Sequence, residues 1–295
     1  MTIKLFKTFL VDRATLLLQG EDVNDFLQNI ISNNIDLVTK DQSIYSTLLN
    51  PQGKFMFDFI LFKKNNLNEI YLDCDKNRAE QLIKTLNLYK LRKNVQISIL
   101  NKIKTICVYG EDKNIFKILK LNSKEGSSKI INTSVKIVDP RNKNLGIRIY
   151  KFNEKNSINL SKIKSEPISK YDELRINLVI PDSSKDLEIG KSFLLENNFD
   201  ELKAIDFKKG CYIGQENTAR QKYRGTHKKI LAKVKIYGKN LKNGTKIIYK
   251  DRHIGNIRSS TNKTGLVTIR TEVYQEFIKN NSKISVLNSY IKFIN

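Results

Sequence analysis

The chain has 295 residues, of which 40% are hydrophobic and 28% are charged, as is typical of a soluble globular protein. A chain of this length can bury a hydrophobic core and divide into two or three domains. Its formal net charge of +23 suggests nucleic acid or an anionic ligand as a partner. The lysines, however, are spread along nearly the whole sequence, without an RRM, KH or zinc-finger pattern. We therefore expect no direct nucleic-acid binding, whereas an anionic small ligand remains compatible.

The positions of the cysteines and histidines indicate which cellular compartment to expect and whether a metal site is expected. Cys74, Cys107 and Cys211 lie far apart and form no CxxC pair, which favours a reducing compartment. His227 and His253 fall in no metal-binding motif, so no metal site is expected. The N-terminal segment lacks signal-peptide form, and no segment approaches the roughly 20 apolar residues of a membrane span. These features predict a cytosolic (cytoplasmic) protein without a membrane partner.

The first hundred residues mix strands and helices. We expect strands at residues 3–11, 14–18, 43–49, 54–62, 69–73 and 95–100. Apolar residues recur at helical spacing from Val23 to Ile31, and Asp75 can cap a second helix whose apolar stripe runs from Ala79 to Tyr89. Mixed elements with short hairpins predict an α+β fold and not a regular βαβ alternation.

Asp58 stands out in the strand expected at residues 54–62. Large apolar residues from Phe55 to Leu61 share one face of that strand, whereas Asp58 lies on the opposite, mostly apolar face. An acid in this position either points to solvent at a sheet edge or lies beside a pocket. The pattern leaves both alternatives open.

The remaining chain is expected to form two further regions. A second α+β unit contains strands at 103–109, 130–138 and 145–150, helical segments at 114–119 and from 168 until Pro181, and a polar loop at 151–167. Short strands at 230–237, 245–249, 253–258, 265–269 and 283–287 then predict a small antiparallel barrel or sandwich. The expected domains are residues 1–101, 102–228 and 229–295.

The most unusual stretch of the chain is Lys208-Lys209-Gly210-Cys211-Tyr212-Ile213-Gly214-Gln215-Glu216. Its glycines permit positive φ and close backbone approach, which indicates a shaped loop. Nearby cations would stabilise the thiolate of Cys211 and make it a candidate reactive cysteine. The alternative is a buried cysteine beside a solvated basic loop.

This stretch carries a family resemblance. Residues Lys209 to Glu216, followed by Thr218-Ala219-Arg220, closely resemble the signature of the YgfZ family, whose members are folate-binding, aminomethyltransferase-like proteins that support iron–sulfur cluster assembly. A mitochondrial branch of that family shares the signature. Similar blocks cover most of the chain, among them Pro51-Gln52-Gly53-Lys54-Phe55, Asp139-Pro140-Arg141 and Leu145-Gly146-Ile147-Arg148.

The resemblance implies a T-protein-like fold, with two interleaved α+β units and a C-terminal antiparallel β-barrel around a central folate cavity. It implies tetrahydrofolate, or a one-carbon-substituted form, as the cofactor. It also implies transient iron–sulfur client proteins, such as tRNA-modifying enzymes, as partners. In the related T-protein of the glycine cleavage system an acid follows a glycine-containing turn, and Asp58 occupies the similar position after Gly53. The block around Arg148 lacks another acid of that enzyme, which argues against glycine cleavage.

The same resemblance provides the candidate site. The catalytic candidates are Cys211 and Asp58, and the role of the thiol stays open between a nucleophile, a transient sulfur or metal contact and a redox sensor. The cofactor-binding candidates fall into three groups. They are the acids expected at the pterin (Asp58 and Glu196), the loop residues (Lys209, Gly210, Tyr212, Gly214, Gln215 and Glu216), and a cation expected at the cavity mouth (Arg220). The glycines alternatively serve loop geometry alone, and Gln215 and Glu216 alternatively bond the backbone of the loop.

We therefore expect a tetrahydrofolate-binding protein that supports assembly or repair of iron–sulfur clusters in client enzymes. A first alternative is an aminomethyltransferase or another folate-dependent one-carbon transferase that uses the same pocket. A second alternative is a basic RNA- or protein-binding scaffold. Whether the protein turns over any substrate is left open by the sequence.

Overall fold

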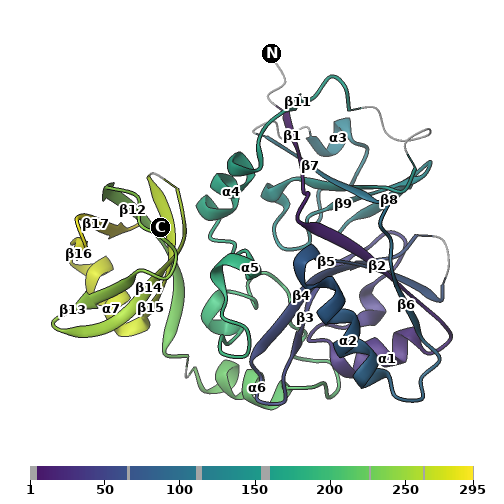
Figure 1. Ribbon diagram of the computed structural model, residues 1–295, viewed down its shortest axis with the longest axis horizontal. Helices are drawn as coiled ribbons and strands as arrows, with labels where there is room; N and C mark the ends of the chain where they lie inside the picture. The colour runs from purple at the N-terminus through teal and green to yellow at the C-terminus, as the bar shows by residue number, and fades with distance from the viewer. Residues whose placement is uncertain are drawn as a thin grey trace. The chain divides into compact units, whose positions relative to one another are not determined.

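The computed structural model describes residues 5–64, 67–110, 115–153, 160–225, 227–261 and 263–294 (Figure 1). The expected elements at residues 3–4 and 114, and residues 154–159 of the expected loop at 151–167, lie outside these ranges. The chain divides into two compact units. Unit 1 comprises Met1–Leu49, Met56–Lys170 and Leu202–Ile213, and unit 2 comprises Asn50–Phe55, Tyr171–Glu201 and Gly214–Asn295.

The first sheet of unit 1 has five strands in the order β3-β4-β5-β2-β6. The strands are β2 (Arg13–Gln19), β3 (Ile44–Leu49), β4 (Phe55–Phe62), β5 (Glu69–Asp75) and β6 (Gln96–Ile99). The helices α1 (Val23–Ile30) and α2 (Ala79–Lys90) bury their apolar stripes in one core with this sheet, as the helical spacing predicts (Figure 1). The Asp75 side chain caps the 3₁₀ turn η2 (Lys76–Arg78), which leads into α2.

The second sheet of unit 1 has six strands in the order β11-β1-β7-β10-β9-β8. Its elements are β1 (Leu5–Phe9), β7 (Lys104–Gly110), β8 (Ser128–Ile131), β9 (Ser134–Val138), β10 (Ile147–Lys151) and β11 (Lys164–Ser165), and the helix α3 (Ile115–Ile118) follows β7. Because β1 pairs antiparallel with β7, the N-terminal strand belongs to the sheet of the following region. The segments of unit 1 therefore interleave along the chain.

One strand expected in this sheet is in fact two. The range 130–138 reads as continuous, but Asn132 has φ 53 and turns the chain between β8 and β9. Leu145, expected to open the next strand, instead ends the 3₁₀ turn η3 (Lys143–Leu145). Asparagine tolerates the left-handed region, so a reverse turn fits inside an apparently uninterrupted β pattern.

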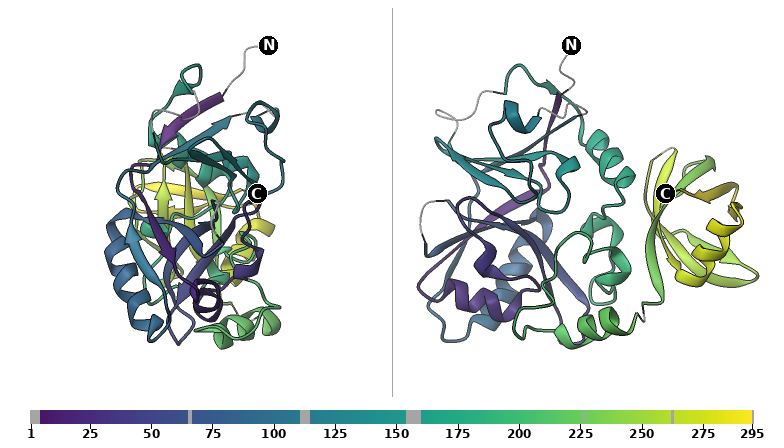
Figure 2. Two further views of the ribbon diagram at one scale, coloured as in Figure 1. Left: turned by 90° about the vertical axis from the view of Figure 1, so that its right-hand side faces the viewer. Right: turned by 180° about the vertical axis from the view of Figure 1, so that it is seen from behind.

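Unit 2 contains a six-stranded antiparallel sheet in the order β13-β14-β15-β12-β17-β16 (Figure 2). The strands are β12 (Lys229–Gly238), β13 (Lys246–Tyr249), β14 (Arg252–Ser260), β15 (Thr264–Arg270), β16 (Ile284–Val286) and β17 (Ser289–Phe293). The edge strands β13 and β16 contact each other, so the sheet is nearly closed. The strand β17 and the helix α7 (Thr271–Lys279) were not predicted, although Val273 and Phe277 of α7 show the i, i+4 spacing of a buried helix face.

The segments that precede this sheet form short helices, of which the first begins at the end of unit 1 and the others lie in unit 2. They are α4 (Ile168–Asn177), α5 (Ser183–Asp186), η4 (Leu195–Asn197) and α6 (Gln215–Arg224). The buried Arg175 joins α4 to Asp186 of α5 at 2.8 Å, and both side chains bond Ser259 of β14. This cluster fixes α4 and α5 on the sheet of unit 2. No helix within the described ranges is long and apolar enough to cross a membrane.

Candidate functional site

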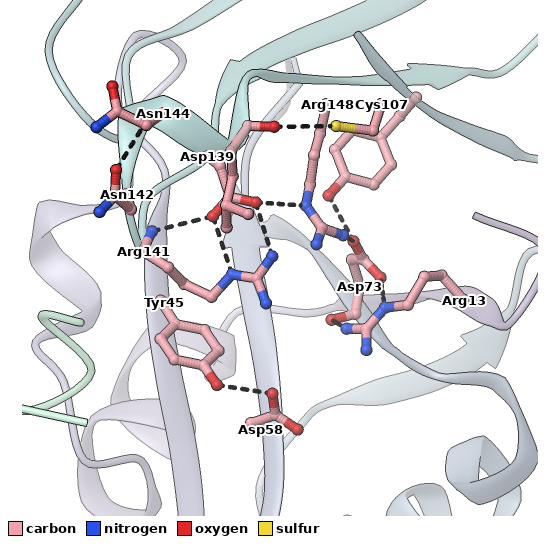
Figure 3. Close-up of polar contacts among 12 residues, drawn as sticks. Arg13, Tyr45, Asp58, Asp73, Cys107, Asp139, Arg141, Asn142, Asn144 and Arg148 are labelled. Carbon is pink, nitrogen blue, oxygen red and sulfur yellow. Dashed lines mark hydrogen bonds and ion pairs between the residues drawn. The ribbon is translucent and has the colours of Figure 1, made fainter. Parts of the chain in front are cut away.

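Asp58 of β4 is buried and hydrogen-bonded. Its side chain is 8% exposed, which excludes the solvent-facing alternative. The Tyr45 hydroxyl of β3 donates to Asp58 Oδ2 at 2.7 Å (Figure 3). Burial, and then the charge of Asp58, raise the pKa of Tyr45 well above 10, so the hydroxyl keeps its proton and remains a donor. Tyr45 therefore holds the Asp58 carboxylate in one orientation.

A second buried acid, Asp73 of β5, binds two arginines and a tyrosine. Arg13 Nε donates to Asp73 Oδ1 at 2.7 Å, while Arg148 Nη1 and the Tyr150 hydroxyl donate to Oδ2 at 2.8 and 2.6 Å. Burial by itself would raise the pKa of Asp73, but the charges of Arg13 and Arg148 outweigh it and lower that pKa. Asp73 is therefore a carboxylate that its partners keep ionised.

Asp139, which follows β9, continues the network. Arg148 Nε donates to Asp139 Oδ2 at 2.9 Å, and Arg141 donates to both carboxylate oxygens at 2.9 and 2.8 Å. Burial acts to raise the pKa of Asp139, whereas Arg141 and Arg148 depress it far below the ordinary range. Figure 3 shows the guanidinium of Arg148 between the two acids. Arg13, Asp73, Arg148, Asp139 and Arg141 thus form one alternating chain that joins both sheets of unit 1.

The two parts of this region meet at Arg141. Its guanidinium carbon lies 5.7 Å from the centre of the Tyr45 ring, within the range of a cation–π contact. Because Asp139 holds Arg141 through two nitrogens, the position of Tyr45, and through it that of Asp58, is supported by the ion network. We call Asp58, Tyr45 and these five network residues the carboxylate site.

Only part of the carboxylate site is predictable from the sequence. Asp58 stands out by its place on an apolar strand, whereas Asp139, Arg141 and Arg148 appear only within blocks of a resemblance. Arg13, Tyr45, Asp73 and Tyr150 were not predicted. A signal was present, since Asp73 and Arg148 each interrupt an apolar strand, and charges in such positions are paired when they are buried.

Lys209 is anchored inside unit 1. Its side chain is 8% exposed, and Nζ donates to the carbonyl oxygens of Gln28, Ile31 and Asn33 at 2.7, 2.7 and 3.0 Å. These three bonds use all three donors of an ammonium group. Burial lowers the pKa of Lys209 to about 8, which leaves it mostly charged at neutral pH. Lys209 therefore ties the loop to the C-terminal end of α1, and its assignment to cofactor binding stays a prediction.

Cys211 lies between two anchored side chains and is itself exposed. Lys209 on one side contacts the ring of the buried Tyr212 on the other, with Nζ 5.1 Å from the ring centre. The alternative of a buried Cys211 is thereby excluded. Cys74 and Cys107, in contrast, are buried, and burial raises the pKa of each to about 12. Their thiols stay protonated, so Cys211 is the accessible thiol among the three.

The end of the loop belongs to unit 2 and requires glycine. Gly214 precedes α6 with φ 81, and Gly53 has φ 72. A Cβ atom on Gly53 would lie 2.9 Å from Gly214 O and 2.9 Å from Asn217 Cβ. Gly210, in contrast, has open space around it. The loop-geometry role that the sequence left open therefore has direct support at Gly214 and not at Gly210.

The other polar candidates also belong to unit 2. Glu216 and Arg220 form an exposed ion pair along α6 at 2.5 Å, beside the half-buried Gln215. Glu196 of η4 is half-buried, and burial raises its pKa, although Lys229 and Lys54 act in the opposite direction. Asp58, Lys209, Gly210, Cys211 and Tyr212 belong to unit 1. Across the described ranges no group of three or more His, Cys, Asp or Glu side chains could hold a metal ion.

A solved structure identifies the fold. The glycine cleavage system aminomethyltransferase T from Bartonella henselae matches with a TM-score of 0.77, over 99% of this chain and 85% of that one, at 11% sequence identity. The chain has an aminomethyltransferase T fold. The expectation of a T-protein-like α+β fold with an antiparallel, barrel-like C-terminal sheet is confirmed.

Curated relatives extend along most of the chain. The mitochondrial iron–sulfur cluster assembly factor IBA57 homolog of Neurospora crassa is 28% identical over 241 residues, which cover 78% of this chain and 53% of that protein. The Dictyostelium discoideum homolog is 27% identical, with coverage of 80% and 64%, and human IBA57 is 26% identical, with coverage of 90% and 77%. The chain thus spans between half and two thirds of the first two relatives. No protein-family model matches the chain.

These relatives overturn one expectation. A cytosolic protein was predicted, whereas the relatives are mitochondrial. Cysteine usage separates reducing from oxidising compartments, but it does not separate the cytosol from other reducing compartments. None of these relatives is described as acting in tRNA modification, so that expectation has no support.

Proposed function

We propose that the chain is a YgfZ-like, tetrahydrofolate-binding protein that supports assembly or repair of iron–sulfur clusters in client proteins. Its similarity to iron–sulfur cluster assembly factors supports the cluster role, and the aminomethyltransferase T fold supports the folate role. The observation that carries the proposal is the buried carboxylate of Asp58, held by Tyr45 on the strand that follows the Gly53 turn.

The carboxylate site fits a reduced pterin in its chemistry. A carboxylate offers about four lone-pair positions and can accept several hydrogen bonds, of which the Tyr45 hydroxyl donates one to Asp58. Asp58 would accept hydrogen bonds from pterin or amine N–H groups, while Tyr45 and Arg141 keep it in place. Tetrahydrofolate, when bound, would supply a carrier for a one-carbon unit.

Cys211 takes a separate part in this proposal. Its thiol is exposed, whereas the flanking Lys209 and Tyr212 side chains are buried and fix the loop. An exposed thiol on an anchored loop is accessible to a partner protein. We assign Cys211 to the step that involves the client, with Asp58 assigned to folate, so the two functions are separable by mutation.

Calorimetric titration with tetrahydrofolate tests the folate role. Wild type should bind with a measurable Kd, and Asp58→Asn should weaken binding at least tenfold, because an amide lacks the second acceptor oxygen. Tyr45 can still donate to the amide oxygen, so the variant should fold. Asp41→Asn, an exposed control, should bind as wild type does. Absence of heat from wild type at high micromolar tetrahydrofolate would refute the folate role.

A cluster-enzyme activity assay in cells that lack the endogenous protein tests the second role. Cys211→Ser should keep wild-type folate affinity and lose support of the client enzyme. Full support by Cys211→Ser would remove the thiol from the mechanism. Failure of the wild-type chain to restore activity would refute the assembly role while leaving folate binding intact.

A one-carbon transferase is the second candidate, because Asp58 has the position of the acid in the related T-protein. The opposing observation is Arg148, which stands in the block where that enzyme carries an acid and is engaged by Asp73 and Asp139. Turnover of a methylene donor by wild type, lost in Asp58→Asn, would favour the transferase. Retained client support in the same variant would separate cluster assembly from that turnover.

A further inference from the structure

A pocket with a volume of about 750 Å³ lies in unit 1. Three connections form its walls: the one between β1 and β2, the junction of β5 with α2, and the one between β6 and β7. Asp58, Tyr45 and Cys211 are not among its lining residues. Its volume falls in the range of small-molecule sites, which is about 300–1,000 Å³.

Backbone hydrogen bonds hold the walls of this pocket together. Leu10 N donates to Thr105 O at 3.0 Å, and Leu100 N donates to Thr15 O at 2.9 Å, so the β1–β2 and β6–β7 connections are joined twice. Lys76 N donates to Asp12 O at 2.8 Å and adds the third wall. The pocket is therefore preformed, and a ligand would not have to order a loop to enter it.

The lining combines apolar surface with positive charge. Phe9 and Val11 are 44% and 70% exposed at the rim, which is unusual for large apolar side chains. Among the lining residues, Lys76 and Lys104 outnumber the acid Glu80, and Arg13, which also binds Asp73, adds a third cation. An apolar wall with a net positive charge is complementary to an organic anion.

Two polar groups of the pocket could donate hydrogen bonds to a ligand. Arg13 contacts Asp73 through Nε and Nη2 and does not use Nη1 for that acid. Thr15 is 2% exposed, and its hydroxyl oxygen has no hydrogen-bond partner within the described part of the chain. A buried hydroxyl without a partner is unfavourable, and an acceptor on a ligand would offset that cost.

We propose that this pocket binds a small organic anion, in which a carboxylate or phosphate group is attached to an apolar or aromatic body. The anionic group pairs with Lys76, Lys104 and the unused Arg13 nitrogen. The body of the ligand covers Phe9 and Val11. The pocket shares Arg13 with the carboxylate site, but its lining residues include neither Asp58 nor Tyr45, the two residues to which the proposed function assigns the pterin.

A fluorescence titration with 8-anilinonaphthalene-1-sulfonate, an aromatic anion, tests this site on the full chain. Wild type should show one saturable site. The double variant Lys76→Glu/Lys104→Glu should raise the Kd at least tenfold, because both exposed cations are reversed. The control Lys84→Glu/Lys129→Glu changes the net charge equally at exposed lysines outside the pocket and should stay within twofold of wild type. Equal Kd values for the two double variants, or no saturable binding, would overturn the proposal.

Thr15→Val offers a second variant that preserves shape. Removal of a hydroxyl without a partner should leave the urea midpoint unchanged or raise it, and should weaken binding of the dye about threefold or more. An unchanged Kd would remove Thr15 from the site. The urea midpoint of each lysine variant is measured alongside, so that loss of binding is read only from folded protein.

Competition with the dye identifies the anion and separates this site from the folate site. Displacement by octanoate or by hexyl phosphate supports the proposal and reports the preferred head group. Displacement by inorganic phosphate at equal concentration would refute the need for an apolar body. Tetrahydrofolate should bind Lys76→Glu/Lys104→Glu as tightly as wild type. If that variant bound neither the dye nor tetrahydrofolate, the two ligands would share one site, and the proposal of a separate anion site would be overturned. The proposal that the chain binds folate would not be affected.

Discussion

Two charged regions of the molecule differ in burial. In the ion network of unit 1, the side chains of Asp73, Asp139 and Arg148 are 0–3% exposed. On α6 of unit 2, Glu216 and Arg220 are 83% and 50% exposed. Exposed ion pairs contribute roughly 0–1 kcal/mol, whereas removal of one partner from a buried pair costs about 3–5 kcal/mol. A stretch of sequence that is rich in charged residues is therefore not necessarily where ion pairs stabilise the fold.

The largest expected effect is that of Arg148→Met. This change leaves Asp73 and Asp139 buried without the cation between them, and we expect the free energy of unfolding to fall by about 3–5 kcal/mol. Urea denaturation followed by circular dichroism measures it. Lys222→Met on α6, which removes a partly exposed ion pair with Asp200, should change that free energy by at most about 1 kcal/mol. Similar losses in the two variants would abolish the distinction between the regions.

The contribution of the buried ion network to stability should also be visible in the pH dependence of unfolding. The folded-state pKa values of Asp73 and Asp139 lie below the unfolded-state value of about 3.9. Their stabilisation is therefore fully present above that value and is lost as the pH falls through the folded-state pKa values. Below pH 4 each carboxylate contributes a slope of up to about 1.4 kcal/mol per pH unit. Urea denaturation at pH 6, 4 and 3 measures this slope.

Arg148→Met serves as the control for the acid experiment. It removes a cation that depresses the pKa of both acids, so its free energy of unfolding should depend less on pH between 4 and 3 than that of wild type. Parallel curves for the two proteins would show that the network is not the source of acid sensitivity.

The smallest expected effect compares a buried lysine, Lys209, with its exposed neighbour Lys208 in the same loop. Lys209→Met removes three hydrogen bonds to buried carbonyl groups, and we expect a loss of about 2 kcal/mol together with faster amide exchange in residues 208–213. The adjacent Lys208 is exposed, so Lys208→Met should change stability by less than about 0.5 kcal/mol. Equal effects at the two positions would contradict the positioning role of Lys209.

Local patterns were sufficient for much of the fold. Helical spacing located α1 and α2, and alternation with glycine- or asparagine-containing turns located most strands. The failures have physical causes. Asn132 reverses the chain inside a β-like run, and the short helix α7 lies among strands, where its i, i+4 pair at Val273 and Phe277 was overlooked. Pairing of β1 with β7 depends on tertiary structure, which no local pattern encodes.

The candidate site was less accessible to sequence reasoning. Asp58 could be selected because it interrupts an apolar strand, and Cys211 because of its motif. The partners of Asp73 could not be assigned, since Arg148 is 75 residues away in sequence and only the fold brings the two together. Lys209 was selected for ligand contact because it lies in a basic loop, whereas its three carbonyl partners are visible only in the structure.

Because β1 pairs with β7 in the second sheet, β1 cannot complete its pairing until later residues have been synthesised on the ribosome. The five strands from β2 to β6 are complete at residue 99, so the first sheet can form while the chain is still being made. Leu5–Phe9 must wait for Lys104–Gly110, and Asp73 must wait for Arg148 and Tyr150 to emerge. Until then Arg13, already translated, is the cation that can neutralise Asp73 in the nascent chain.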